Sequence, residues 1–232
     1  MSAARRLTYF AVVAMSAASR LAAADRYEAS VTLRPIGGVS RVTEDVGGND
    51  GATSTAPRAT GATTYSAGGE LELAYGLRNW LDVSAELVAS GCTEASYDQA
   101  RVSVMGAPAT GHLVRTTRLA QLRAGATLRA GVAWVSTLHL GLGVGGRASS
   151  AATLAGATQG RMFETTPDGM SSGVSMDGAV VARVGLEHRL GARWGIGVAA
   201  EATHTTGFGA APIDTASAGI SLSYTWYPLL PW

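Results

Sequence analysis

The sequence has 232 residues, enough for one domain with a substantial buried surface. Its formal net charge is +1, and its 18 basic residues are all arginines that are scattered along the chain, so we expect no nucleic acid among its partners. No run beyond the N-terminus reaches the roughly 18 apolar residues of a membrane helix. The only cysteine, Cys92, excludes an internal disulfide.

The first 24 residues predict a cleaved signal peptide. Arg5 and Arg6 supply a positive end, residues 7–18 form a short apolar run, and three alanines at 22–24 form a small-residue cleavage site. We therefore expect residues 1–24 to be removed on export and residues 25–232 to form a single domain.

Beyond residue 25, apolar and polar residues alternate with a period of two. Leu71, Leu73 and Tyr75, for example, alternate with Glu70 and Glu72. The same pattern recurs in eight segments, at residues 27–34, 70–77, 81–87, 121–128, 137–144, 180–187, 195–203 and 219–226. Alternation predicts strands, and each segment approaches the ~10 residues with which a tilted strand crosses a bilayer. The sequence thus predicts an all-β fold, an eight-stranded antiparallel up-and-down transmembrane barrel.

The connections between these segments alternate strictly between tight and long. Tight turns are expected around residues 78–79, 130–131 and 191–192, and long connections at 36–64, 90–112, 147–175 and 205–214. This places the short turns at one rim and the long loops at the other. Outer-membrane barrels have short periplasmic turns and long extracellular loops, so we expect an integral protein of the cell outer membrane with both termini in the periplasm.

Tryptophans mark the rim of the tight turns. Trp80, Trp134 and Trp194 each follow a tight turn closely, and Trp226 lies near the C-terminus. Because tryptophan favours the headgroup level of a bilayer, these four residues predict an aromatic girdle.

Alternation alone does not say which face of each strand points outward. A soluble barrel would place its apolar residues inside and its polar residues in water. Here the polar face is rich in Gly, Ala, Ser and Thr, which suit a crowded lumen, and a tryptophan rim has no purpose in water. We therefore expect the apolar faces to contact lipid.

Two hairpins carry a resemblance to a known family. The segments "ELELAYGLRNWLDVSAEL" and "RVGLEHRLGARWGIGVAAE", together with the C-terminal Trp232, resemble the small outer-membrane barrels related to outer-membrane proteins A and X and the opacity proteins, over residues 25–232. Pro228 and Pro231 depart from that pattern because they interrupt the last strand. The resemblance implies outer-membrane lipid, lipopolysaccharide and the barrel-assembly machinery as partners.

The four histidines and the acidic residues are the candidates for a catalytic or a metal site. None of the histidines (His112, His139, His188 and His204) stands two residues before a serine, the spacing that would place both on one strand face for nucleophilic hydrolysis. The acidic segment 44–51 matches a calcium loop poorly. We expect no enzyme activity, no catalytic residue, no cofactor and no metal.

Charged residues on the lumen face predict a belt of ion pairs. Its expected members are Glu70, Glu72, Glu86, Arg123, Arg183, Glu187 and Glu201. Glu70, Glu86, Arg123, Arg183 and Glu201 lie roughly eight to ten residues from the nearest tight turn, so their depths in the barrel are comparable. Charges in a narrow lumen must be paired, and we predict that the belt closes the barrel.

The predicted function is a structural or surface-interaction role, with an extracellular ligand expected at loops 36–64 and 147–175. The alternative is a narrow porin-like channel, and a lipid-modifying enzyme is kept in reserve. Lumen size separates the first two, because eight strands enclose a space that side chains can fill.

Overall fold

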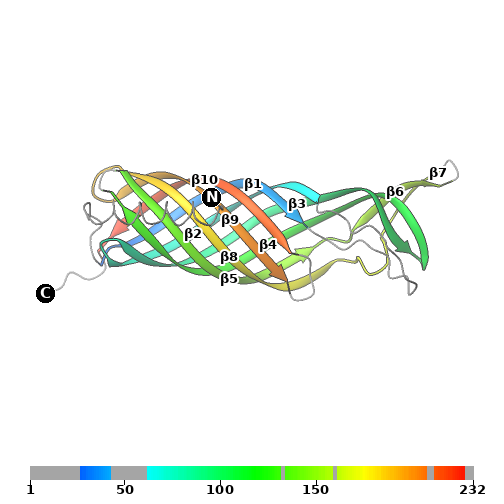
Figure 1. The fold of residues 1–232 in the computed structure, drawn as a ribbon, viewed down its shortest axis with the longest axis horizontal. Helices are drawn as coiled ribbons and strands as arrows, with labels where there is room; N and C mark the ends of the chain where they lie inside the picture. The colour runs from blue at the N-terminus through cyan, green and yellow to red at the C-terminus, as the bar shows by residue number, and fades with distance from the viewer. Residues whose placement is uncertain (1–26, 43–61, 132–133, 159–160, 208–211, 228–232) are drawn as a thin grey trace, which may run out of the picture.

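The computed structural model describes residues 27–42, 62–131, 134–158, 161–207 and 212–227 (Figure 1). The expected signal peptide, the acidic segment 44–51 and Trp232 lie outside the described residues. No helix among the described residues is long and apolar enough to cross a membrane.

Eight antiparallel strands form a closed ring. Their bounds are β1 (Ala29–Val42), β2 (Ala62–Arg78), β3 (Leu81–Val104), β4 (Ala107–Ala130), β5 (Trp134–Ser149), β8 (Gly173–Arg189), β9 (Trp194–Gly207) and β10 (Ile213–Trp226). Each strand pairs with the next around the barrel, and β10 pairs with β1 to close it. Figure 1 shows the strands inclined to the long axis of the barrel, as closure requires. The predicted eight-stranded antiparallel barrel is confirmed.

The barrel carries polar residues inside and apolar residues outside. On β8, Val184 is 56% exposed whereas the preceding Arg183 is 4% exposed. The other strands repeat this contrast, with buried Glu70 and Glu86 beside exposed Leu71 and Leu87. Successive side chains of a strand point to opposite faces, so one alternating sequence produces both surfaces. The polar face therefore lines the lumen, as the sequence predicts.

One end of the barrel, here called the turn end, contains the tight connections β2–β3, β4–β5 and β8–β9. Gly131 and Gly191 have φ values of +116° and +94°, which favour glycine. The tryptophans at this end, Trp80, Trp134, Trp194 and Trp226, are between 37% and 58% exposed. The ring of Trp194 lies 4.9 Å from that of Tyr224. The aromatic residues thus gather on the outer wall at this end.

At the opposite end, here called the loop end, the expectation of a long loop at 90–112 is wrong. Strands β3 and β4 continue through this segment and meet at a two-residue turn, Met105-Gly106, in which both residues have positive φ. The pairing shifts register between Ser90 and Thr93 and again between Tyr97 and Ala100. These irregularities, together with many small residues, break the alternation that marks a strand in the sequence.

The third long connection, 147–175, also contains strands. A short hairpin of β6 (Thr153–Thr158) and β7 (Arg161–Thr165) extends from β4, to which β6 pairs. Figure 1 shows this hairpin projecting beyond the barrel. Phe163 and Met170 pack against a buried apolar cluster, whereas Met162 is 84% exposed.

That apolar cluster occupies the loop end of the barrel. Its buried members are Val42, Ala95, Tyr97, Ala100, Val102, Leu113, Ala152, Leu154 and Ile213. The hydroxyl of Tyr97 on β3 donates to the carbonyl oxygen of Val42 on β1 over 3.4 Å, which joins two strands that are not ladder neighbours. The lumen is therefore polar at mid-height and apolar where the loops begin.

Asp168 fastens the third connection to the tip of the β3–β4 hairpin. Its carboxylate accepts hydrogen bonds from the Ser103 hydroxyl at 2.7 Å, the Gly106 amide at 2.9 Å and the Met105 amide at 3.0 Å. The Gly106 amide, followed by the Ser103 hydroxyl and the Met105 amide, lowers the pKa of Asp168 below its ordinary value of 3.8.

Asp168→Asn should weaken this contact at neutral pH, because a carboxamide keeps only one acceptor oxygen for three donors. A depressed carboxyl pKa means that the contact is fully present above the ordinary value and is lost as the pH falls through the lowered one. We expect the amide NMR resonances of Met105 and Gly106 to move in the variant at pH 7, and in the wild type only during acid titration, with a midpoint below pH 3.8. A wild-type midpoint at or above that value would contradict the contact.

Candidate functional site

The strand register brings the charged lumen residues into one layer. Glu86 on β3 is the direct cross-strand partner of Glu72 on β2 and of Arg123 on β4. On the other side of the barrel, Arg183 on β8 faces Glu201 on β9. These pairings place the residues at a common depth around the lumen, here called the central layer.

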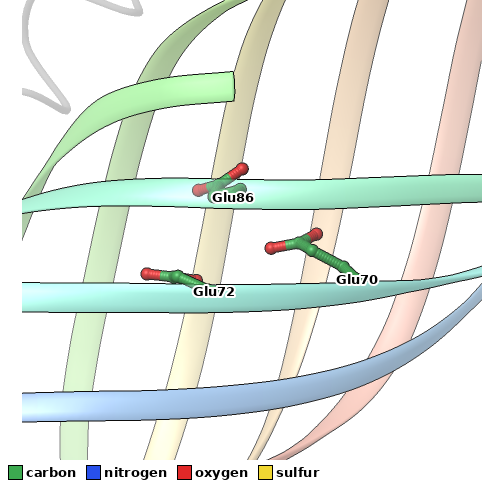
Figure 2. Close-up of side chains that lie close together, drawn as sticks. All are labelled: Glu70, Glu72 and Glu86. Carbon is green, nitrogen blue, oxygen red and sulfur yellow. The ribbon is translucent and has the colours of Figure 1, made fainter. Parts of the chain in front are cut away.

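Arg183 is the hub of the central layer. Its Nη1 donates to Glu70 Oε1 at 2.5 Å and to Glu201 Oε2 at 3.4 Å. Its Nη2 donates to Glu72 Oε2 at 2.7 Å and to Glu86 Oε1 at 2.9 Å. Glu70 and Glu72 lie on β2 and Glu86 on β3, with their carboxylates close together (Figure 2). One guanidinium thus crosses the lumen and joins carboxylates of three strands, a use for which its planar fork of donors is suited.

Two further arginines complete the layer. Arg34 on β1 pairs with Glu70 and, at 3.2 Å, with Glu72. Arg123 Nη1 donates to Glu201 Oε1 at 2.8 Å, while its Nε and Nη2 donate to Gln121 Oε1 at 3.1 and 2.9 Å. Three arginines therefore face four glutamates, all of them buried.

A histidine, His139, lies beside Glu86, one of the four glutamates of the central layer. His139 Nε2 is 3.0 Å from Glu86 Oε1, and Nδ1 is 3.0 Å from the Thr127 hydroxyl. A proton held by this pair would bring the layer to neutrality. Glycines make the space: a Cβ at Gly125 would lie 2.4 Å from His139 Cε1, and one at Gly141 would lie 2.8 Å from Nε2. Glycine on the lumen face is therefore what admits the large ring.

Ion pairs also lie on either side of the central layer. Towards the turn end, Arg189 pairs with Glu28 at 2.9 Å, and Arg129 pairs with Asp82. Towards the loop end, Arg147 Nε contacts Asp177 Oδ2 at 2.7 Å. Charged pairs thus recur along the length of the lumen.

Two small cavities lie between these layers. A cavity of about 30 Å³ lies on the loop side of the central layer, against Arg123 and Glu201. A cavity of about 60 Å³ lies on the turn side, against Glu72 and Arg183. Each has room for only a few water molecules, so the described lumen is divided by side chains.

Three carboxylates in the central layer also satisfy the spacing of a metal site. Oxygen atoms of Glu70, Glu72 and Glu86 all lie within 4.8 Å of one another. The guanidinium groups of Arg34 and Arg183 already donate to these carboxylates. Because the arginines supply the positive charge that a cation would bring, the arrangement is that of an ion-pair network.

Six of the seven predicted belt residues come together in the central layer: Glu70, Glu72, Glu86, Arg123, Arg183 and Glu201. Glu187 lies nearer the turn end, where it accepts a hydrogen bond from the Ser223 hydroxyl at 3.1 Å and lines the cavity that also contacts Asp82 and Arg129. It is only two residues from the end of β8 at Arg189, so its depth differs from that of the others.

The predicted belt omitted two members of the network. Arg34 has the right strand parity, but β1 follows no tight turn from which its depth could be counted. Gln121 is uncharged and gives no ion-pair signal, although its side-chain oxygen receives two hydrogen bonds from Arg123.

No protein-family model and no curated protein matches the sequence. Solved structures similar to the chain include Ail, the attachment invasion locus protein of Yersinia pestis, with 15% identity over 87% of this chain and 100% of that chain and a TM-score of 0.44. Neisserial surface protein A shows 9% identity over 85% and 96% of the two chains, with a TM-score of 0.45. The outer membrane protein OprG from Pseudomonas aeruginosa shows 10% identity over 89% and 99%, with a TM-score of 0.39. These three proteins are what the chain is similar to, and no family, residue or activity is assigned from them.

Proposed function

We propose that the protein is an integral outer-membrane barrel with a closed lumen, which acts as a structural element of the membrane and as a surface for interactions at its loop end. The turn end and both termini face the periplasm, and the loop end faces outward. The observation that carries this proposal is the central layer, in which Arg183 joins carboxylates from β2, β3 and β9 across the lumen.

The outer wall supports membrane residence. Large apolar side chains such as Leu140, Leu142 and Val184 are more than half exposed, whereas charged residues at the same depth are buried. In water this arrangement would leave a broad apolar surface uncovered, but in a bilayer it matches the apolar band of about 25 Å that outer-membrane barrels present to lipid. The tryptophans of the turn end then lie at the inner interface, and outer-membrane lipid and lipopolysaccharide surround the wall.

The loop end supports an interaction role. The β3–β4 and β6–β7 hairpins project there, and Met105, Met162 and Val174 are 94%, 84% and 82% exposed. Exposed apolar side chains on these two hairpins and at the start of β8 are available for contact with an extracellular ligand. A ligand is expected at the segments 36–64 and 147–175. The described residues of these segments include parts of β1, β2, β5, β6, β7 and β8.

Single-channel recording of the refolded full chain in planar bilayers tests the closed lumen. We expect no steady conductance steps, because a solute would have to displace paired charges that fill the space between the two small cavities. Each protein preparation should first migrate differently on a gel before and after boiling, which shows that the barrel is folded and closed. A large steady current through such a preparation would contradict the proposal and favour a narrow channel.

A further inference from the structure

The outer face of the β3–β4 hairpin carries a hydroxyl, an imidazole and a carboxylate in sequence. The Ser96 hydroxyl oxygen lies 3.0 Å from His112 Nε2. The other ring nitrogen, His112 Nδ1, lies 2.9 Å from Asp98 Oδ1. The two hydrogen bonds therefore use opposite nitrogens of one ring.

Three strands position these residues. Ser96 and Asp98 are two apart on β3, so both point to the outer face, while the intervening Tyr97 is buried. The register shift between Tyr97 and Ala100 places Asp98 in a bulge next to His112 on β4. On its other side, His112 is held by pairing with Ala155 of β6. Bulges commonly redirect side chains beside active sites.

The order of the contacts fixes the chemistry that the group can perform. A carboxylate can only accept a hydrogen bond, so His112 Nδ1 carries the proton and Nε2 presents its lone pair to the Ser96 hydroxyl. This is the arrangement of a nucleophile, a general base and a group that orients the base. We propose that Ser96, His112 and Asp98 form a nucleophilic site that hydrolyses carboxylic acyl esters approaching from outside the barrel.

The reaction uses the ester and solvent water alone. Ser96 Oγ attacks the ester carbonyl carbon as its proton passes to His112 Nε2, and the tetrahedral adduct then expels the alcohol, which takes that proton. Water next attacks the acyl-serine, giving its proton to His112; the carboxylic acid leaves and Ser96 recovers its proton. Asp98 is a positioning residue that orients the imidazole and stabilises its protonated form.

The surroundings suit a short acyl chain. The side chains of His112 and Asp98 are 47% and 93% exposed, so an ester reaches them without entering the lumen. Val114, the cross-strand partner of Ser96, is half-buried and offers one apolar contact for the acyl group. An open site of this kind has no deep acyl pocket, and we therefore expect modest turnover of small esters.

A second exposed pair in the same barrel provides a matched control. His204 Nδ1 lies 2.6 Å from Asp214 Oδ1, with side chains 52% and 61% exposed. The described contacts of His204 include the carboxylate but no hydroxyl. An activity that arises from any exposed imidazole would depend on both histidines, whereas the proposed site depends on His112 alone.

Hydrolysis of p-nitrophenyl butyrate by the full chain, refolded in detergent micelles, tests the site. Ser96→Ala and His112→Gln should each lower the rate by about 100-fold or more, in keeping with the 10²–10⁴-fold that a positioned base contributes. Asp98→Asn should lower kcat while leaving KM unchanged, which separates a role in orienting the base from a role in binding. His204→Gln should retain the wild-type rate.

A fluorophosphonate probe gives an independent readout. Mass spectrometry should find the adduct on Ser96 in the wild type and in His204→Gln, but not in His112→Gln. All variants should retain the mobility difference of a closed barrel. A Ser96→Ala variant that hydrolyses the ester at the wild-type rate, or a wild type that takes up no label at Ser96, would overturn the proposal.

Discussion

Arg183→Ala should destabilise the barrel by about 3–5 kcal/mol, the usual cost of removing one partner from a buried charge network. Arg183 is 4% exposed and donates to four glutamates. Without it, Glu70, Glu72 and Glu86 crowd together with only Arg34 and Arg123 to compensate the layer. Urea unfolding of the protein in lipid vesicles would measure the loss.

A matched variant and a double variant keep this test specific. Arg78→Ala removes an exposed arginine at the turn end and should change the free energy of unfolding by less than about 0.5 kcal/mol. Glu72→Gln combined with Arg183→Ala removes one of the stranded charges, so the double variant should be more stable than the sum of the single changes implies. Additive losses, or equal losses at Arg78 and Arg183, would show that the central layer is not a coupled network.

The period of two was sufficient to predict the membrane-crossing part of the fold. Each segment keeps its apolar residues on one face, so a slip of one residue would move charges such as Glu86 and Arg183 onto the outer wall, and the register is strongly specified. The β3–β4 extension was missed for the opposite reason. Its Ala, Ser and Thr residues have weak contrast, and its two register shifts change which positions face inward.

The candidate site, too, was predictable from the sequence only in part. The face of the strand and the distance from a tight turn suffice to group Glu70, Arg123 and Arg183. On strands of similar tilt, residues that lie the same number of positions from the turn lie at the same depth in the barrel. They do not reveal which carboxylates Arg183 reaches across the lumen, since those contacts span more than 90 residues of sequence.

The Ser96–His112–Asp98 group cannot be recognised from residue spacing along a single strand. Its serine and histidine are 16 residues apart on different strands, and they meet only because β3 and β4 continue as a hairpin where a loop was expected. Such a group on paired strands depends on their register, and in this hairpin the register shifts at two irregular positions.

Val184→Arg should cost about 2–4 kcal/mol of folding free energy in bilayers, because it places a charge on the lipid face near mid-membrane. The depth of Val184 follows from its neighbour Arg183, which lies in the central layer. Its cross-strand partners, Leu138 and Ala200, are apolar, so the new guanidinium would meet no carboxylate there.

Val174→Arg is the matched control. Like Val184→Arg, it replaces a valine by an arginine on the outer face of β8, but ten positions nearer the loop end. Val174 is 82% exposed. At ~3.3 Å per residue the two sites are roughly 33 Å apart along the strand, which places Val174 at or beyond the outer interface, where arginine costs only about 0–1 kcal/mol. Urea titration in vesicles should therefore separate the two variants, while in detergent micelles, which adapt around a charge, the difference should shrink. Equal costs at Val184 and Val174 in bilayers would mean that β8 does not cross the membrane at the height of Arg183, and the assignment of the outer wall to lipid would be wrong.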